Sequence, residues 1–485
     1  MKVLAGLHRA PALLLIAAAL QPFANGRWTV PLIAWLAPMV LLAYLRSAPT
    51  RRGLALGWAL FVAGWAAQWW GIVRLPAPLF ALATLASGFT GFLPYVADRW
   101  LAPRLHGLRS TLVFPAAQVS IELLLSLFAP SGSWGSLAYT QYGDLPLMQL
   151  ASITGLYGIS FLIAWGAAAA NFCFENRHWP PLSARAALIF AATLAAALLY
   201  GGARLAQAPD DGRTLRVATI SPLYDTASDH DPAGASAAQD FLYARSSEQA
   251  AAGAKTILWP EDSFFVRKLD EAVVLERARA FAREQRLYLG IAYGALLDPG
   301  SPRYENKMLL ITPAGDIAWQ YLKNHPVPGR EQMLVVRGDG GPAVHESADG
   351  RFAGAICYDA DFPEFFAGLG AAGVDALYLP ADDWRAIDPL HAHMAVFRAI
   401  EQGFSLVRPT MNGLSIATNH RGEVLGAMDH WQTQDRVMAV NLPLGPVRTI
   451  YSRVGNLFAW LCVAGLLALT VLSKPWIRSR SPKIA

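Results

Sequence analysis

Residues 184–203 read ARAALIFAATLAAALLYGGA, and shortly afterwards the chain continues as RTLRVATISPLYD at 213–225. The first stretch has twenty residues and one charged side chain. Twenty mostly apolar residues are about the length that a helix needs to cross a hydrocarbon core. The second stretch is a short apolar run followed by turn residues, as in a strand of a soluble domain. The change between them predicts a boundary between a membrane part and a soluble part.

The composition supports this division. Hydrophobic residues make up 54% of the 485 residues and charged residues 15%, which favours a membrane protein over two soluble domains. We predict a membrane domain of about seven helices at 1–208, a soluble domain at 209–450, and a last helix with a basic tail at 451–485. The eight apolar stretches are 3–24, 28–45, 53–73, 77–97, 110–128, 148–174, 184–203 and 456–473.

The first apolar stretch has an alternative interpretation. Lys2 and Arg9 precede a short apolar run, as they do in a cleaved signal peptide. No clear small-x-small cleavage site follows, and further apolar stretches do, so we interpret this stretch as a first helix.

Basic residues in short loops indicate the orientation, because such loops stay in the cytoplasm. They follow the second, fourth and sixth apolar stretches and recur in the C-terminal tail. An odd number of helices between the N-terminus and the soluble domain then places that domain outside the cytoplasm. The residues concerned are Arg46, Arg51, Arg52, Arg99, Arg104, Arg109, Arg177, His178, Arg185, Lys474, Arg478, Arg480 and Lys483.

The soluble part alternates strand-like and helical runs, which predicts one α/β or α+β domain. Strands are expected at 215–220, 256–259, 287–293, 307–312, 318–322, 352–356, 375–379, 405–408, 413–418 and 437–441. Helices are expected at 236–252, 270–285, 361–372 and 389–402.

Three reactive residues each follow one of the strand-like runs. Glu261 follows TILWP, Lys323 follows AWQYL and Cys357 follows RFAGAI. Side chains at strand ends can converge on a pocket, where a carboxylate takes a thiol proton and an ammonium stabilises the thiolate and the oxyanion. Cys357 is also the one cysteine of the soluble part, since Cys173 and Cys462 fall in apolar stretches.

Each of these residues has an ordinary alternative role. A glutamate after a strand is usually a solvated turn residue, Lys323 suits a surface, and a cysteine in an AIC run is more often an inert buried side chain. The order and spacing of the surrounding motifs favour the chemical interpretation. These motifs are WPE at 259–261, KNHPVP at 323–328 with Glu331 shortly after it, and ICYD at 356–359.

In this order the motifs resemble the nitrilase (carbon-nitrogen hydrolase) superfamily, and specifically the apolipoprotein N-acyltransferase family. SWGSLAYTQYGDLPLMQLASITGLYGISFL at 133–162 resembles the loop and following helix of that family. The resemblance implies a multi-pass α-helical membrane domain of about eight helices plus an α/β nitrilase-like αββα sandwich. It also implies a bacterial inner-membrane protein whose catalytic domain lies in the periplasm.

The activity implied by the resemblance is N-acylation of the N-terminal diacylglyceryl-cysteine of apolipoproteins. A phospholipid donates the acyl chain through a Cys thioester, and the membrane lipid bilayer is the third partner. Glu261 is implied as general base, Cys357 as nucleophile, and Lys323 as oxyanion ligand together with the backbone N–H after the nucleophile. Three further residues are implied as supporting residues around the triad: Glu331, Tyr358 and Asp359.

The sequence also departs from the family pattern. Asp359 stands where a glutamate is usual, Gly329 and Arg330 replace a Phe-Gly pair, and PADDWRAID at 380–388 replaces an Asn-rich loop with Trp-Phe-Gly. These differences lie in loops around the site rather than in the triad. They bear on the identity of the acceptor more than on the chemistry.

The loop beside the membrane offers two candidate substrate-binding residues. Trp134 and Gln141 are either interface anchors or part of the lining of a lipid pocket. On the helix expected at 389–402, Arg398 and Glu401 are expected to form a buried structural network.

We expect neither a metal nor another cofactor. His230 lies between two aspartates, but no second ligand cluster accompanies it. His391 and His393 are two residues apart on an expected helix, so their side chains point to different faces.

The sequence also leaves alternatives to acyl transfer. A membrane-anchored carbon-nitrogen hydrolase (amidase), or a paralogous acyltransferase with another amine acceptor, would use the same triad, although eight helices exceed what a tether needs. An inactive scaffold is disfavoured by the complete Glu, Lys and Cys set. The net charge of +5 is not concentrated in a basic run of the soluble part, so no nucleic-acid partner is expected.

Overall fold

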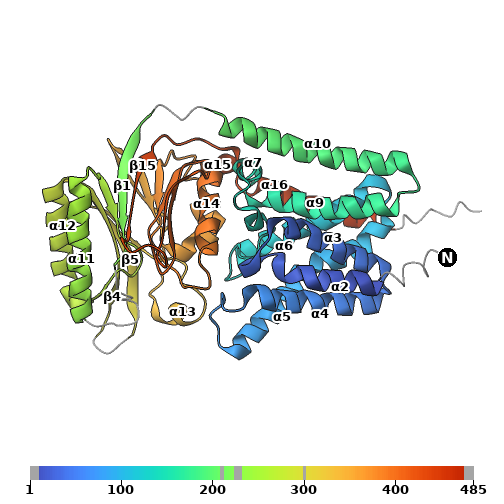
Figure 1. The fold of residues 1–485 in the computed structure, drawn as a ribbon, viewed down its shortest axis with the longest axis horizontal. Helices are drawn as coiled ribbons and strands as arrows, with labels where there is room; N and C mark the ends of the chain where they lie inside the picture. Colours follow the sequence, from blue (N-terminus) through green and yellow to red (C-terminus); the bar gives the residue numbers. More distant parts are fainter. Residues whose placement is uncertain (1–9, 208–211, 223–231, 299–301, 475–485) are drawn as a thin grey trace, which may run out of the picture.

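A computed structural model describes residues 10–207, 212–222, 232–298 and 302–474 of the chain. A bundle of helices and an α/β sandwich lie next to each other along the longest axis of the molecule (Figure 1). His230 with its two neighbouring aspartates, and the basic tail beyond Lys474, lie outside the described residues.

Apolar helices form the bundle, and the described part of each of the eight predicted apolar stretches is mainly helical; the stretch 148–174 is divided between α8 and α9. Four helical segments are long and apolar enough to cross a membrane: Ala77–Arg104, Gly107–Phe128, Leu156–Glu175 and Pro180–Leu205. The helices of this part are α2 (Ala10–Leu20), α3 (Pro31–Ser47), α4 (Thr50–Trp69), α5 (Ala77–Leu101), α6 (Val113–Phe128), α7 (Leu145–Met148), α8 (Ala151–Thr154), α9 (Leu156–Glu175), α10 (Pro180–Leu205), α15 (Ile450–Val454) and α16 (Leu457–Leu472).

Three of the bundle helices end together at an ionic contact. Arg46 at the end of α3 donates to Asp98 near the end of α5, with 2.8 Å between Nη2 and Oδ1. Its Nη1 lies 3.3 Å from Oε1 of Glu175, the last residue of α9. The loops after the second, fourth and sixth apolar stretches therefore lie on one side of the bundle, as the basic residues predict.

The α/β part consists of two sheets between helical layers. The first sheet has the strand order β15-β1-β2-β4-β5-β6, with β3 also paired to β4, and the second has the order β14-β13-β11-β9-β8-β7. Helices α11 and α12 cover the outer face of the first sheet, and α14 separates the second sheet from the helical bundle (Figure 1). This is the αββα sandwich that the resemblance implies.

The bounds of these elements are as follows. The helices are α11 (Pro232–Ala251), α12 (Glu271–Gln285), α13 (Arg330–Leu334) and α14 (Leu390–Gln402). The strands are β1 (Thr214–Ile220), β2 (Thr256–Leu258), β3 (Phe265–Arg267), β4 (Tyr288–Leu296), β5 (Tyr304–Ile311), β6 (Ile317–Leu322), β7 (Ala343–Ser347), β8 (Gly350–Gly354), β9 (Ala376–Tyr378), β10 (Ala381–Asp382), β11 (Ser405–Arg408), β12 (Thr410–Met411), β13 (Leu414–Thr418), β14 (Val424–Asp429) and β15 (Val437–Pro443).

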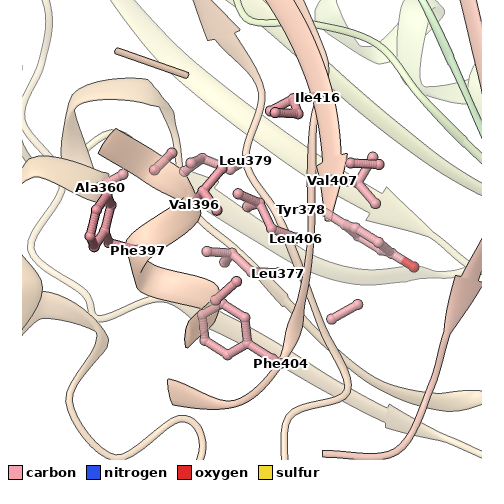
Figure 2. Packing of buried hydrophobic residues seen from close by; sticks show 14 of the residues in the cluster. Ala360, Leu377, Tyr378, Leu379, Val396, Phe397, Phe404, Leu406, Val407 and Ile416 are labelled. Atoms are coloured by element: carbon pink, nitrogen blue, oxygen red, sulfur yellow. The ribbon is translucent and has the colours of Figure 1, made fainter. Parts of the chain in front are cut away.

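Alternation of side chains builds the two cores. On β1, Leu215 and Val217 face the core shared by the two sheets, whereas Ala218 and Ile220 face α11 and α12. The shared core continues through the second sheet to α14, where Val396 lies beside Leu379 and Leu406 (Figure 2). Phe397 of the same helix packs edge-on against Tyr139 on the side of the bundle. The strands that carry the site are therefore backed by apolar layers on both faces.

All ten predicted strands are present, but one predicted helix is wrong. The segment 361–372 contains a short 3-10 turn at Pro363–Phe366 followed by further turns. Gly368 adopts a positive φ of 86°, and a Cβ at Gly370 would lie 1.7 Å from the Gln402 carbonyl oxygen. This close approach and backbone conformation do not fit a helix. The strands that were not predicted, β3, β7, β10, β12 and β14, are short or lie near a sheet edge.

Candidate active site

Three strand ends meet where the two sheets and the bundle come together. Glu261 follows β2 and Lys323 follows β6 in the first sheet, whereas Cys357 follows β8 in the second sheet. All three side chains are buried. Lys323 Nζ lies 2.7 Å from Glu261 Oε1 and 2.6 Å from Glu331 Oε1, so one ammonium links two carboxylates.

Backbone and amide groups fix these carboxylates. Glu261 Oε1 also accepts from Asn306 Nδ2 at 2.7 Å, and its Oε2 accepts from the Asp382 backbone N–H at 2.8 Å. Glu331 Oε2 accepts from the Val327 N–H at 2.9 Å. Burial alone would lower the pKa of Lys323, but Glu261 and Glu331 outweigh it and hold the pKa well above its ordinary value. Lys323 therefore stays positively charged in the site.

Cys357 begins a tight 3-10 turn that ends at Asp361. Its φ is +49°, a left-handed backbone conformation that is uncommon for residues other than glycine, and its N–H donates to the Pro380 carbonyl at 2.9 Å. Burial raises the pKa of the Cys357 thiol to about 12, and Glu261 adds to this, whereas Lys323 and a hydrogen bond from His391 lower it. The thiol thus needs a base to react at neutral pH.

Tyr358 and Asp359 hold this turn. Tyr358 OH donates to the Pro130 carbonyl at 3.1 Å, which links the turn to the loop after α6. Asp359 Oδ2 accepts from Tyr321 OH at 2.6 Å and from the Ile356 N–H at 3.0 Å. The Asp359 carboxylate thus links the turn to Tyr321 of β6.

A second ionic cluster lies beside Cys357, and the sequence interpretation missed it. His391 Nδ1 lies 2.7 Å from Asp383 Oδ1, and its Nε2 lies 3.2 Å from Asp361 Oδ2. Arg408 Nη1 and Nη2 donate to both Asp383 oxygens at 3.0 and 2.9 Å. A cysteine sulfur, an imidazole and a carboxylate are metal ligands, and those of Cys357, His391 and Asp383 lie within 4.8 Å of one another. Because Arg408 already occupies Asp383, the set is an internal ion-pair network rather than an open metal site.

His393 lies apart from this cluster, as the helical spacing predicts. Its ring stacks on Tyr142 with 3.7 Å between ring centroids. On the same helix, Arg398 Nη2 lies 2.8 Å from Glu401 Oε1, and both side chains are buried, so the predicted structural pair is present.

A cavity of about 890 Å³ connects the bundle to the candidate site. Its wall includes residues of α3, α4, α5 and α6, and it extends to Glu261, Lys323 and Glu331. Cys357 itself is 3% exposed, and its neighbour Tyr358 lines the cavity. The residues that α5 contributes to the wall are mostly small: Ala83, Ala86, Ser87, Thr90, Gly91 and Tyr95.

The two candidate substrate-binding residues of the membrane-side loop differ in position. Trp134 lines the cavity, and its indole N–H donates to Asp361 Oδ2 at 2.6 Å. Gln141 is outside the cavity wall: its Oε1 accepts from Trp35 Nε1 at 3.0 Å and its Nε2 donates to the Pro31 carbonyl at 3.2 Å. Gln141 therefore connects the loop to α3. A local sequence pattern beside the membrane does not indicate this contact.

Fold and site together define a membrane protein with a nitrilase-like α/β domain in which Glu261 and Lys323 line a cavity shared with the membrane helices, and Tyr358, the neighbour of the buried Cys357, lines it as well. Residues 14–169 match the family model for the apolipoprotein N-acyltransferase N-terminal domain, and residues 235–451 match that for carbon-nitrogen hydrolase. The chain belongs to the apolipoprotein N-acyltransferase family.

Relatives match along most of the chain. An apolipoprotein N-acyltransferase of Azotobacter vinelandii is 30% identical over 87% of this chain and 87% of the relative. One of Geobacter metallireducens is 29% identical over 91% of each chain, and one of Pseudomonas paraeruginosa is 27% identical over 87% of this chain and 88% of the relative. A solved amidase from Nesterenkonia sp. aligns with 50% of this chain and 94% of its own, at 21% identity and a TM-score of 0.40. The sequence relatives thus cover both the helical and the α/β part.

Proposed function

We propose that this protein transfers an acyl chain from a phospholipid to the α-amine of the N-terminal diacylglyceryl-cysteine of apolipoproteins. The observation that carries the proposal is the cavity, which extends from between α3, α4, α5 and α6 to Glu261 and Lys323. A water-soluble amide substrate needs no route between membrane helices. An acyl chain does, and the small side chains of α5 leave room for one.

The proposed reaction has two steps that share one nucleophile. Glu261 takes the thiol proton of Cys357, and the sulfur attacks the ester carbonyl carbon of the phospholipid. The C–S bond forms, the C–O bond to glycerol breaks, and the lysophospholipid oxygen leaves with the proton from Glu261. The acceptor amine then attacks the thioester carbon, an amide C–N bond forms, the C–S bond breaks, and the amine proton returns to the thiol through Glu261.

Charge stabilisation in both steps falls to Lys323. Each tetrahedral intermediate carries an oxyanion, and a buried ammonium stabilises such a charge far more than water does. The Tyr358 backbone N–H is the second proposed donor. Glu331, which holds Lys323 from its other side, keeps the ammonium at the cavity wall.

The test of this chemistry is a trapped acyl-enzyme. The purified protein incubated with phospholipid alone should acquire a hydroxylamine-sensitive acyl adduct on Cys357, detected by peptide mass spectrometry. Cys357→Ser should abolish both the adduct and transfer to a diacylglyceryl lipopeptide. Full transfer by Cys357→Ser would overturn the mechanism. An adduct that releases only free fatty acid in the presence of the lipopeptide would instead favour a hydrolase.

The proposed location is the bacterial inner membrane, with the α/β part in the periplasm. The motivating observation is that the basic loop residues lie on one side of the bundle, where Arg46 meets Asp98 and Glu175. A periplasmic reporter fused after residue 210 should be active, and a cytoplasmic reporter should be active after Lys483. The reverse pattern would contradict the orientation.

A further inference from the structure

The steps proposed above leave one set of polar neighbours of Cys357 without a role. His391 comes from α14, Asp361 from the turn that Cys357 begins, and Asp383 follows β10. A ring nitrogen of His391 and the Cys357 sulfur lie within 4.8 Å of each other, and all four residues are buried. An imidazole this close to a nucleophilic sulfur affects the charge that the sulfur can carry.

The surroundings of His391 favour its charged form. Asp383 and Asp361 face its two nitrogens at 2.7 and 3.2 Å. Arg408 of β11 pairs with Asp383 at 2.9 Å, and its Nη2 also lies 2.9 Å from His391 Nδ1. Burial alone would lower the pKa of His391, but the two carboxylates outweigh burial and hold the pKa well above its ordinary value. With both nitrogens protonated, Nδ1 faces the Asp383 carboxylate and Nε2 faces the Asp361 carboxylate, so each added proton lies beside an acidic oxygen.

We propose that His391 is a further functional residue of this site, whose positive charge, held beside Cys357 by Asp361 and Asp383, favours the thiolate of the nucleophile. The proposal rests on the proposed function in taking Cys357 as the nucleophile. The thiol proton still passes to Glu261, and His391 keeps both of its protons throughout, so the proton balance of the two steps is unchanged. The sulfur then has two cationic neighbours, Lys323 and His391.

The loop after α6 orients one of the two carboxylates. Ser133 donates to the Asp361 carbonyl oxygen from its N–H at 2.8 Å and from its hydroxyl at 2.7 Å, and Trp134 donates to the Asp361 carboxylate. Glu122 of α6 in turn accepts from Ser136 Oγ at 2.8 Å and from the Leu137 N–H at 3.1 Å. The charge beside the nucleophile is thereby connected to a helix of the bundle through a short chain of hydrogen bonds.

Alkylation of Cys357 by iodoacetamide tests the proposal without any acyl donor, so its failure is distinguishable from failure of the proposed function. The full-length protein is alkylated between pH 6 and 10, and the rate at Cys357 is read by peptide mass spectrometry. His391→Gln keeps hydrogen-bonding groups but carries no charge, and should react at least about tenfold more slowly at pH 7. His393→Gln, two residues away and stacked on Tyr142, is the matched control and should react like the wild type.

The pH dependence separates charge from a structural role. The ratio of wild-type to His391→Gln rates should be largest near neutrality and should shrink as the pH rises through the pKa of His391. Asp361→Asn removes one carboxylate but leaves an oxygen for Trp134. It should lower the pKa of His391, so its alkylation rate should fall behind the wild-type rate from a lower pH onward. Asp361→Asn also tests the proposal if His391→Gln does not fold. Equal rates at pH 7, or in folded variants a rate ratio that is the same at every pH, would overturn the proposal.

Discussion

The two polar sets around Cys357 differ in origin and in surroundings. The lysine set, Glu261, Lys323 and Glu331, comes from the first sheet and α13 and lines the cavity. The imidazole set, Asp361, Asp383 and His391, belongs to the second sheet's side of the domain and is closed internally by Arg408. In the proposed mechanism, the cysteine between the two sheets therefore takes its proton acceptor from one sheet and additional positive charge from the other. Substitutions in the two sets should therefore cause different defects.

The largest effect in the lysine set is expected from Lys323→Ala. Removing the ammonium takes away the proposed oxyanion donor and leaves the Glu261 and Glu331 carboxylates without their shared cation. Transfer should fall by about 10²–10³-fold, or about 2.7–4 kcal/mol of barrier, as for a lost oxyanion donor. Single-turnover acylation measures this. Lys268→Ala removes a partly exposed lysine and should leave the rate unchanged. A comparable loss in both variants would argue against a specific role for Lys323.

Glu261→Gln should be next in size. The amide oxygen can still accept from Lys323, while the amide NH2 replaces the oxygen that accepts from the Asp382 N–H, so the side chain keeps its size and one bond while the base is lost. Acyl-adduct formation should slow by roughly 10²-fold or more, the usual contribution of a positioned base. This variant distinguishes the two sets, because in the proposed mechanism Glu261 alone accepts the thiol proton. If Glu261→Gln acylated at the wild-type rate and His391→Gln did not, the base would belong to the imidazole set.

The pH profile of the wild-type thiol gives a smaller, graded effect. The pKa of Cys357 is raised to about 12 because burial disfavours the thiolate, so the thiol form predominates throughout the neutral range. Below that pKa the thiolate fraction rises about tenfold per pH unit, so the alkylation rate should rise about 10²-fold between pH 6 and pH 8. The slope should lessen at higher pH where His391 loses its proton. A plateau already reached near pH 7 would mean that the two cations outweigh burial.

The lysine set could be predicted from sequence, whereas the imidazole set could not. Glu261, Lys323 and Cys357 each follow an apolar run with strand periodicity, so local sequence indicates both the strand and the polar residue at its end. His391 lies within a helix that was predicted correctly, but its partners come from positions 30 and 8 residues earlier through turns without periodicity. The wrong helix at 361–372 has the same cause. Close packing of Gly370 against the Gln402 carbonyl is a tertiary contact that no local pattern records.

The smallest effect should come from Trp134→Phe, a change in the membrane-side loop that reaches the imidazole set only through Asp361. Phenylalanine keeps a ring near Trp69 and His391, whose centroids lie 5.5 and 5.9 Å from that of Trp134, but it removes the N–H that Asp361 accepts. Losing one hydrogen bond to a carboxylate costs about 1.5–3 kcal/mol locally, and only part of this reaches the sulfur through Asp361 and His391. We therefore expect alkylation of Cys357 at pH 7 to fall by roughly two- to fivefold.

Trp165→Phe is the matched control, since the indole N–H of Trp165 donates to Thr111 at 3.1 Å within the bundle, away from the site. Both variants should lose a similar amount of thermal stability, and only Trp134→Phe should change the alkylation rate. Equal alkylation in the two variants would show that the membrane-side loop supports the fold but does not act on the nucleophile.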